Sequence, residues 1–353
     1  MMRQLKIKPQ AMNYKYIYAS LTRISDLKDK PFDVKKLDKS RWQTGDYVVC
    51  EIITQGSTNF KLELQNGRMR GVMGGESLVG ALGERHATLE ATGTWKATEA
   101  DGILHVLTAA GLLGKLTSKS IYIHEMMKVK YIGHAFRADK KLTMDDFVKP
   151  VKQAPFNIPV VLFVGTSMSA GKTTSARIVT NILKKAGLKI VGAKLTGAGR
   201  YKDVLAIKDV GADAVYDFVD AGLPSSICDK TTYLKKVSYL KNKIAGVDAD
   251  IAVIEIGASP LEPYNGDLAI EAIRDHIKCI ILSASDPYAV FGLMEAFDIV
   301  PDIVTGISTN TLGGRELVER LCRVPALNLI DPKTTGTLIN ILNKTLNLDL
   351  KYV

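Results

Sequence analysis

From Val160 onward the chain alternates short apolar runs with amphipathic stretches, and this alternation constrains the fold more than any other feature. The runs read "PVVLFVG", "KIVGAKLTG", "DIAVIEIG", "KCIILSAS", "DIVTGIST" and "PALNLI". They are rich in valine and isoleucine, as are parallel strands covered on both faces. Between the first two lies "KTTSARIVTNILKKAG", with apolar residues at helical spacing and Gly187 at its end. The pattern predicts an α/β fold with a doubly wound, mostly parallel sheet.

The first half of the chain has a different periodicity. From about Thr44 to Arg137 it alternates in short runs bounded by glycine, and "QNGR" is a hairpin signal. This predicts a smaller, mostly β domain, either a barrel or a sandwich. The stretch "KPVKQAPFNIP" contains three prolines and separates the halves. We therefore expect a basic segment over 1–40, a β domain over 41–148, a proline-rich linker over 149–159 and a nucleotide-binding α/β domain over 160–353.

The charge is concentrated near the N-terminus. Of the net charge of +10, residues 1–150 contribute +8, and the first 40 residues hold 10 basic against 4 acidic side chains. This stretch lacks the interleaved aromatics of an RNA-binding surface, so we expect a solvated tail and disfavour nucleic acid as a partner. No apolar run approaches about eighteen residues, the first residues hold no apolar signal segment, and the four cysteines are dispersed. We expect a cytoplasmic protein without a membrane segment.

The sequence Gly171-Lys172-Thr173 follows a predicted strand and opens a predicted helix, which is the context of a phosphate-binding P-loop. Backbone N–H groups at the helix start surround an anion, the lysine reaches the outer phosphates, and the threonine hydroxyl binds Mg²⁺. The glycine usual at position 166 is replaced by Thr166, and Gly165 lies one residue earlier. The residues expected to bind the nucleotide here are Gly165, Thr166, Ser169, Ala170, Gly171, Lys172, Thr173 and Thr174.

Polar residues at the ends of the other strands complete the predicted site. Glu255 lies in an apolar strand, where a carboxylate needs a metal or a cation nearby. Lys194 ends another strand, and Asp203 follows in the next loop. We expect Lys172, Lys194 and Glu255 to be catalytic, and Mg²⁺ to be held by Thr173, Asp203 and Glu255. The alternatives are a salt-bridged edge glutamate and solvated loop charges. Asn310, after the fifth run, is a candidate for reading the adenine edge.

Three stretches together resemble a known family. "GTSMSAGKT", "AKLTGAGR" with a following aspartate, and "IEIGAS" look like the signatures of dethiobiotin synthetase and the cobyrinic acid a,c-diamide synthases. In that family the loop also begins Gly-Thr. The resemblance covers about residues 158–350 and implies roles for Lys172, Thr173, Lys194, Asp203 and Glu255 as P-loop, magnesium and charge-neutralising residues. Ile256 departs from the family's glycine at that position. The resemblance also implies a homodimer.

The resulting expectation is an ATP- and Mg²⁺-dependent enzyme, a ligase, synthetase or small-molecule kinase that activates a small acidic metabolite. Two other classes stay open. One is an acyltransferase on the same fold, with acetyl-coenzyme A in the phosphate loop and an acidic amino acid as acceptor. The other is a regulatory NTPase switch, although the chain has no guanine-reading Asn-Lys-x-Asp stretch and has Ser167 where dimeric switch ATPases carry a second lysine. Arg85 and His86 lie on a glycine-rich stretch that could face the nucleotide domain and clamp an anionic substrate, but we favour tight turns with surface charge for this stretch.

Overall fold

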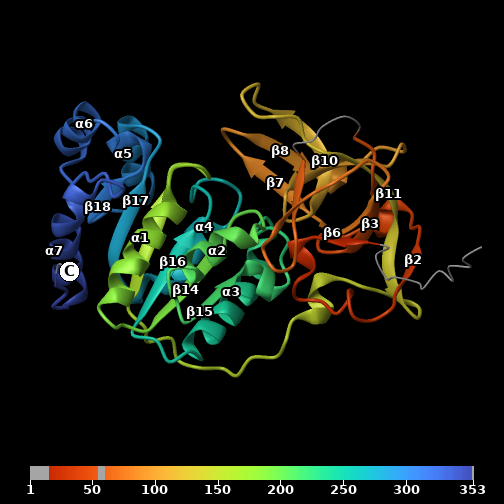
Figure 1. The fold of residues 1–353 in the computed structure, drawn as a ribbon, viewed down its shortest axis with the longest axis horizontal. Helices are drawn as coiled ribbons and strands as arrows, with labels where there is room; N and C mark the ends of the chain where they lie inside the picture. The colour runs from red at the N-terminus through yellow and green to blue at the C-terminus, as the bar shows by residue number, and fades with distance from the viewer. Residues whose placement is uncertain (1–15, 55–59, 352–353) are drawn as a thin grey trace, which may run out of the picture.

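Figure 1 shows the computed structural model, in which a β region (residues 16–148) lies beside an α/β region (residues 160–351). The structure describes residues 16–54 and 60–351. Of the basic segment expected over 1–40, residues 1–15 lie outside the described residues. In Figure 1 the six strands of the α/β region are flanked by helices on both sides, and the β region packs against the end that carries α2 and α3.

The β region is built on a closed ring of strands. In the described part of the chain its ten-stranded sheet has the order β1-β6-β3-β11-β9-β10-β8-β7, with β2 and β12 paired to β11. Because β6 also pairs with β10, the strands β6, β3, β11, β9 and β10 close into a small barrel, one of the two expected forms. The strands are β1 Ile17–Tyr18, β2 Asp33–Lys35, β3 Tyr47–Ile52, β6 Ser77–Leu82, β7 Glu84–Ala87, β8 Ala91–Thr94, β9 Ile103–Thr108, β10 Leu112–Lys119, β11 Lys128–Arg137 and β12 Lys140–Lys141.

The remaining elements of this region are short. The expected "QNGR" turn joins β4 (Lys61–Glu63) to β5 (Met69–Gly71) in an antiparallel hairpin, with Gly67 at φ +82°. The 3-10 helices are η1 Ser20–Thr22, η2 Lys39–Arg41, η3 Trp95–Ala97 and η4 Met144–Phe147.

Residues 16–40 are not a separate basic segment. β1 pairs with β6, and β2 pairs with β11, so this stretch completes the sheet of the β region. Its charges are partly compensated: Arg23 is buried against Asp217 of the α/β region. The count of basic residues indicated a solvated tail because a count over one segment does not include the carboxylates from distant parts of the chain that pair with these basic residues.

The α/β region is a parallel sheet in the order β15-β14-β16-β13-β17-β18, and all its strand pairings are parallel. This confirms the predicted fold class. The strands are β13 Val160–Gly165, β14 Ile190–Thr196, β15 Ala214–Asp217, β16 Ile251–Ile256, β17 Ile277–Ser283 and β18 Ile303–Thr305. The helices are α1 Lys172–Lys185, α2 Tyr201–Lys208, α3 Lys230–Ala245, α4 Gly266–Ile273, α5 Pro287–Phe297, α6 Leu312–Cys322 and α7 Thr335–Leu346, with 3-10 helices η5 Phe218–Ala221, η6 Arg274–His276, η7 Ile307–Thr309 and η8 Pro332–Thr334.

Two details of the strand assignment differ from the sequence expectation. "PALNLI" is not a strand: it makes a single bridge, Val304 to Ala326, while Leu327 and Leu329 pack into the core beside α7. The pattern missed β15, the edge strand, because its residues are only half-buried and carry no continuous apolar run.

Among the described residues, the buried hydrophobic side chains form three clusters, and the largest of them runs through both regions. This largest cluster joins Tyr47 and Met144 of the β region to Leu195 and Phe218 of the α/β region. An interface of this apolar kind resists sliding or rotation of one part against the other. The shared core therefore favours local motion over movement of one region against the other.

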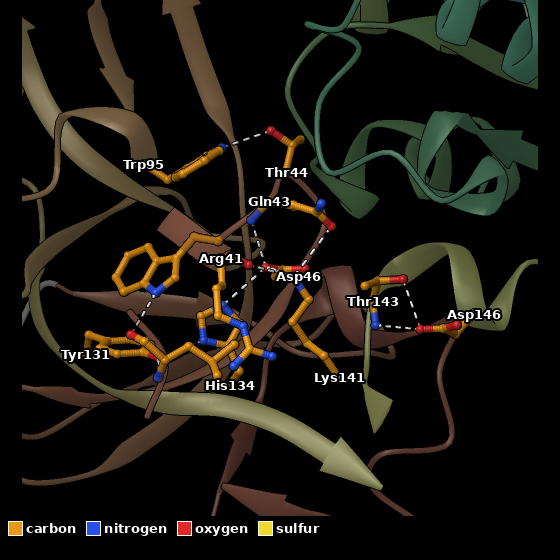
Figure 2. A network of polar contacts seen from close by, with 12 residues as sticks. Arg41, Gln43, Thr44, Asp46, Trp95, Tyr131, His134, Lys141, Thr143 and Asp146 are labelled. Carbon is orange, nitrogen blue, oxygen red and sulfur yellow. Dashed lines mark hydrogen bonds and ion pairs between the residues drawn. The ribbon is translucent and has the colours of Figure 1, made fainter. Parts of the chain in front are cut away.

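A buried polar network fixes the segment that leads into β3 (Figure 2). Oδ2 of Asp46 accepts hydrogen bonds from Lys141 Nζ at 2.8 Å and from the backbone N–H of Gln43 at 2.7 Å. His134 Nε2 lies 3.2 Å from the same oxygen, and its Nδ1 lies 2.6 Å from the Tyr131 hydroxyl. Asp46 and His134 are fully buried, so these contacts are strong determinants of the local fold.

None of the helices in the described part of the chain has both the length and the apolar character that crossing a membrane requires. All four cysteines are unpaired thiols.

Candidate functional site

The candidate site lies where three neighbouring strands end. Because β14, β16 and β13 are parallel, their carboxyl ends meet at one edge of the sheet, where ligands of such folds bind. Glu255 of β16 pairs in register with Phe163 of β13 on one side and with Lys194 of β14 on the other. The strand register therefore places Glu255 between the phosphate loop and Lys194.

The phosphate loop connects β13 to α1. Gly171 has φ +111°, a conformation that favours glycine, and Lys172 is the first residue of the helix. Lys172 is buried, and its Nζ donates to the carbonyl of Ser167 at 2.6 Å. Burial lowers the pKa of Lys172 to about 8, although the nearby Glu255 carboxylate partly offsets this effect. An ammonium group is thus held inside its own loop.

Gly165 and Gly257 are required by close packing around the two lysines. A Cβ at Gly165 would lie 3.0 Å from Cδ of Lys172 and 2.8 Å from the carbonyl oxygen of Ser283. A Cβ at Gly257 would lie 2.3 Å from Cε of Lys194. The glycine at position 165, one place earlier than usual, therefore leaves the space that the Lys172 side chain needs.

Thr173 and Glu255 form the part of the site that suits a divalent cation. The Thr173 hydroxyl donates to Oε2 of Glu255 at 2.9 Å, and Glu255 is only 2% exposed. Mg²⁺ in such sites is bound by one or two protein oxygens, by phosphate oxygens and by water. A hydroxyl beside a carboxylate fits that donor set. Within the described residues no group of three or more His, Cys, Asp or Glu side chains is arranged to hold a metal without a ligand's help.

Lys194 and Asp203 form a largely buried ion pair in the wall of the same cavity as the phosphate loop. Burial on its own lowers the pKa of Lys194, but the carboxylates of Asp203 and Glu255 outweigh it and raise the pKa. For Asp203, burial favours the neutral acid, and the neighbouring Lys194 ammonium outweighs it and lowers the pKa. Asp203 is thus engaged by a lysine, so its predicted role as a metal ligand would require that pair to open.

These residues line one cavity of about 620 Å³ between the two regions. Its α/β wall includes Gly171, Thr174 and the loop residues Arg200 and Lys202, and its β wall includes Phe60, Lys61 and a run of methionines at 126–127. Six basic side chains face four acidic ones around the cavity. The cavity therefore combines an excess of positive charge with an apolar wall, as in sites that bind phosphorylated small molecules.

The phosphate loop is in direct contact with the β region. Ser169 Oγ donates to Oε1 of Glu90 at 2.5 Å, and Glu90 also pairs with Arg85. Nη1 of Arg85 donates to the carbonyl of Leu107 at 2.7 Å, while its Nε is buried and has no hydrogen-bond partner in the described part of the chain. Arg85 lines the cavity, so the alternative that the sequence analysis did not favour, an arginine facing the nucleotide domain, describes its position.

Further hydrogen bonds hold the regions together around the cavity. Glu63 is fully buried and accepts from the backbone N–H groups of Tyr201 and Lys202, both at 2.8 Å, so it caps the start of α2. Glu262, which follows β16, accepts from the backbone N–H of Thr88 at 2.8 Å and from its hydroxyl at 2.7 Å. Glu63 of the β region thus fixes the start of α2, and Glu262 of the α/β region fixes the turn that contains Thr88.

The structure brings most of the predicted residues together. Ser169, Gly171, Lys172, Thr173, Thr174, Lys194, Asp203 and Glu255 all line the cavity. Three other predicted loop residues, Gly165, Thr166 and Ala170, are not among the described residues that line the cavity. The Thr166 hydroxyl accepts a hydrogen bond from the backbone N–H of Ser285 at 3.1 Å. Asn310 is exposed, follows η7 and is not among the residues that line the cavity, all drawn from the described part of the chain. Its assignment to the adenine edge gains no support.

Sequence reasoning missed Glu63 and Glu90. Glu63 follows Leu62 in an alternating stretch, so the sequence pattern places Glu63 on the solvent-facing side of the strand. In the structure Leu62 and Glu63 are both buried, because the start of α2 covers the side on which Glu63 lies. Glu90 lies in the turn between β7 and β8, with no motif around it. Neither residue carries a local signal for its contact with the α/β region, because Ser169 and Tyr201 lie 79 and 138 positions further along the chain.

Comparison with known proteins gives likenesses of fold. No protein-family model and no curated protein sequence matches the chain. Chloroplast FtsY from Physcomitrella patens matches at 16% identity and TM-score 0.36, over 50% of this chain and 59% of that chain. HypB from Helicobacter pylori in complex with nickel matches at 16% and 0.36, over 56% and 91%. The signal recognition particle 54 kDa protein from Aeropyrum pernix K1 in complex with GDP matches at 18% and 0.33, over 56% and 50%.

These comparisons correct one prediction. The matched structures are signal recognition particle proteins and hydrogenase maturation factors, so the expected ATP-dependent ligase, synthetase or small-molecule kinase is wrong, and we do not carry it further. The α/β P-loop fold stands. The resemblance to dethiobiotin synthetase stays a prediction.

Proposed function

We propose that this chain is a nucleotide-dependent switch, in which Mg²⁺-bound ATP in the cavity changes the contact between the phosphate loop and the β region. The observation that carries the proposal is the hydrogen bond from Ser169, in the phosphate loop, to Glu90 of the β region. The negative charge of phosphate repels a carboxylate at the rim of the site, so the hydrogen bond of Glu90 depends on whether phosphate is bound.

Electrostatics give the direction of the change. Lys172, Lys194 and the N–H groups at the start of α1 are placed to receive phosphate oxygens, and Thr173 with Glu255 would hold the cation. The cation would neutralise part of the phosphate charge. Glu90 shares this cavity, and like charges repel strongly where water is partly excluded. Occupancy of the site therefore favours a conformation in which Glu90 releases Ser169.

Release of Glu90 has a second consequence for Arg85. In the structure Glu90 neutralises Arg85, and both line the cavity. When Glu90 withdraws, the Arg85 guanidinium is left without its carboxylate and is available to a phosphate oxygen, for which its geometry is suited. The cavity wall would thus present a paired, neutral Arg85 and Glu90 without nucleotide and an unpaired Arg85 guanidinium with nucleotide.

The motion that follows is confined to the turn between β7 and β8. The continuous core and the Glu63 cap hold the rest of the β region in place. β7 is the last strand in the sheet order and pairs only with β8 among its described neighbours, and Leu89 in the turn is 61% exposed. The turn is tied through Thr88 to Glu262, in the loop that follows β16. We define it as the sensor turn, residues 88–90.

ATP is the nucleotide we propose, because the chain has no Asn-Lys-x-Asp stretch for reading guanine. Calorimetry with MgATP, MgGTP and acetyl-coenzyme A, on the wild type and on Lys172→Ala, tests the binding step. We expect MgATP binding that is lost in the variant. Binding of acetyl-coenzyme A alone would overturn the proposal and identify the loop as a coenzyme A cradle.

Hydrogen exchange tests the switching step. With MgATP we expect faster amide exchange over residues 86–92 in the wild type and no change in Lys172→Ala. Glu90→Gln should exchange fast there even without nucleotide, while Glu51→Gln, an exposed residue of β3 outside the cavity, should behave as the wild type. Nucleotide binding with unchanged exchange in the sensor turn would refute the switch and leave only a binding protein.

A further inference from the structure

A second cavity lies on the other side of α2, at the junction of the two regions. It has a volume of about 280 Å³, room for roughly ten non-hydrogen atoms at about 30 Å³ per water molecule. Its walls come from both regions, with Arg23, Phe147 and Lys149 on one side and Tyr239 and Lys243 on the other. It shares no lining residue with the nucleotide cavity among the described residues.

The charge of this second cavity is positive. Arg23, Lys149 and Lys243 face it, and Asp220 is the one carboxylate that the described residues place in its wall. Asp220 lies 3.6 Å from both Arg23 Nη2 and Lys243 Nζ, so one carboxylate is shared between two cations. Lys149 forms no ion pair with any described residue. The wall therefore has cationic groups in excess of the carboxylates that could neutralise them.

Arg23 is held in a way that suits it to bind an anion. Its side chain is 8% exposed, its Nη2 pairs with Asp217, and its guanidinium stacks at 4.4 Å from the centre of the Tyr201 ring. Nη1 is buried and has no hydrogen-bond partner among the described residues. A buried guanidinium N–H without an acceptor costs stability, and an anionic ligand supplies that acceptor after a small local shift.

Aromatic rings form the rest of the wall. Phe147, Tyr201 and Tyr239 line the cavity, and the Tyr239 hydroxyl donates to the carbonyl of Lys149 at 2.9 Å, which joins the two sides. Rings and cations together select a compact anion with some apolar surface. We propose that this junction cavity is a second binding site, for a small carboxylate or phosphate metabolite, separate from the nucleotide cavity.

The position of the junction cavity couples it to α2. Tyr201 opens α2 and lines the junction cavity, while its neighbours Arg200 and Lys202 line the nucleotide cavity. A ligand against Arg23 and Tyr201 thus touches the same helical turn that Glu63 caps. The site is placed to bind an effector of the nucleotide site.

The test uses the full chain with Lys172→Ala, so that the phosphate loop does not compete for anions. Inorganic phosphate, a phosphate monoester (glycerol 3-phosphate), succinate and citrate are titrated by calorimetry. We expect saturable binding of at least one, weakened at least about tenfold by the double change Lys149→Gln and Lys243→Gln. Lys235→Gln, exposed on the same helix and outside the cavity, is the matched control.

Two results would overturn the proposal: no saturable binding of any of the four probes, or equal affinity in the double variant and the control. Neither Lys149 nor Lys243 is buried in the core, so the double variant should fold, which its melting temperature verifies. Failure here would leave the nucleotide switch untouched, because that proposal rests on MgATP binding to the unaltered Lys172.

Discussion

The hydroxyl of Thr173 donates a hydrogen bond to Oε2 of Glu255 across 2.9 Å, which joins the first turn of α1 to the end of β16. The two residues are 82 positions apart. This contact aligns a hydroxyl and a carboxylate beside the buried ammonium of Lys172, and it defines the place where a cation would meet the phosphates.

Glu255→Gln should weaken Mg²⁺-dependent ATP binding by about 10- to 100-fold, because the amide cannot supply the negative charge that orients Thr173 and the cation. Calorimetry with and without Mg²⁺ measures this loss. Glu271→Gln, an exposed change on α4, is the control. Equal Mg²⁺ dependence in wild type and Glu255→Gln would remove Glu255 from the site.

ATP binding should weaken as the pH rises above about 8, because burial holds the pKa of Lys172 near that value and phosphate binding requires the ammonium form. Each added pH unit should then lower the affinity by up to about tenfold. Titrations at pH 8.5 in two buffers of different ionisation enthalpy should show proton uptake on binding. Proton release, or a flat affinity between pH 7 and 9.5, would contradict this prediction.

The same residue should make the free protein more stable as the pH rises from about 8 to 10.5. In this window the unfolded chain, with the ordinary lysine pKa of 10.5, binds more protons than the folded chain, so stability increases with pH. Below pH 8 the burial of charged Lys172 costs roughly 3 kcal/mol. Urea unfolding of the wild type should show this rise, and Lys172→Met should be more stable at pH 7 and lack that part of the rise.

Glu90→Gln should bind MgATP about fivefold more tightly, because roughly 1 kcal/mol of repulsion between unit charges in a solvated cavity is removed. Arg85→Ala should have the opposite effect once nucleotide is bound, since it removes the cation that Glu90 releases. The affinities come from the same calorimetric titrations. Weaker binding by Glu90→Gln would show that Glu90 supports the phosphate loop and does not oppose phosphate.

Asp46→Ala should destabilise the protein by about 3 to 5 kcal/mol, because it removes the acceptor that the buried His134 and the Lys141 ammonium share. Guanidinium unfolding followed by circular dichroism measures the change. Asp139→Ala, at a fully exposed carboxylate, is the control and should leave the midpoint unchanged. A loss below about 1 kcal/mol would show that the network in Figure 2 does not hold the β region together.

Local signals were enough for the α/β half. The Val- and Ile-rich runs and the helical spacing after Lys172 are the patterns of strands buried on two faces and of a helix buried along one stripe, and each pattern is carried by residues close in sequence. Glycine at positions 165 and 171 could likewise be interpreted from the loop alone. By itself the sequence therefore determined the parallel sheet, the phosphate loop and the grouping of Lys172, Thr173, Lys194 and Glu255 at one sheet edge.

Only the tertiary structure decided how the β region contributes. Glu90 contacts Ser169 from 79 positions away, Glu63 caps a helix that starts 138 positions later, and Arg23 meets Asp217 across 194 positions. Such pairings arise from how two sheets pack, and packing couples residues without leaving a pattern near either one. For that reason the basic N-terminal count indicated a free tail, whereas the folded chain places its buried arginine at the wall of a second cavity.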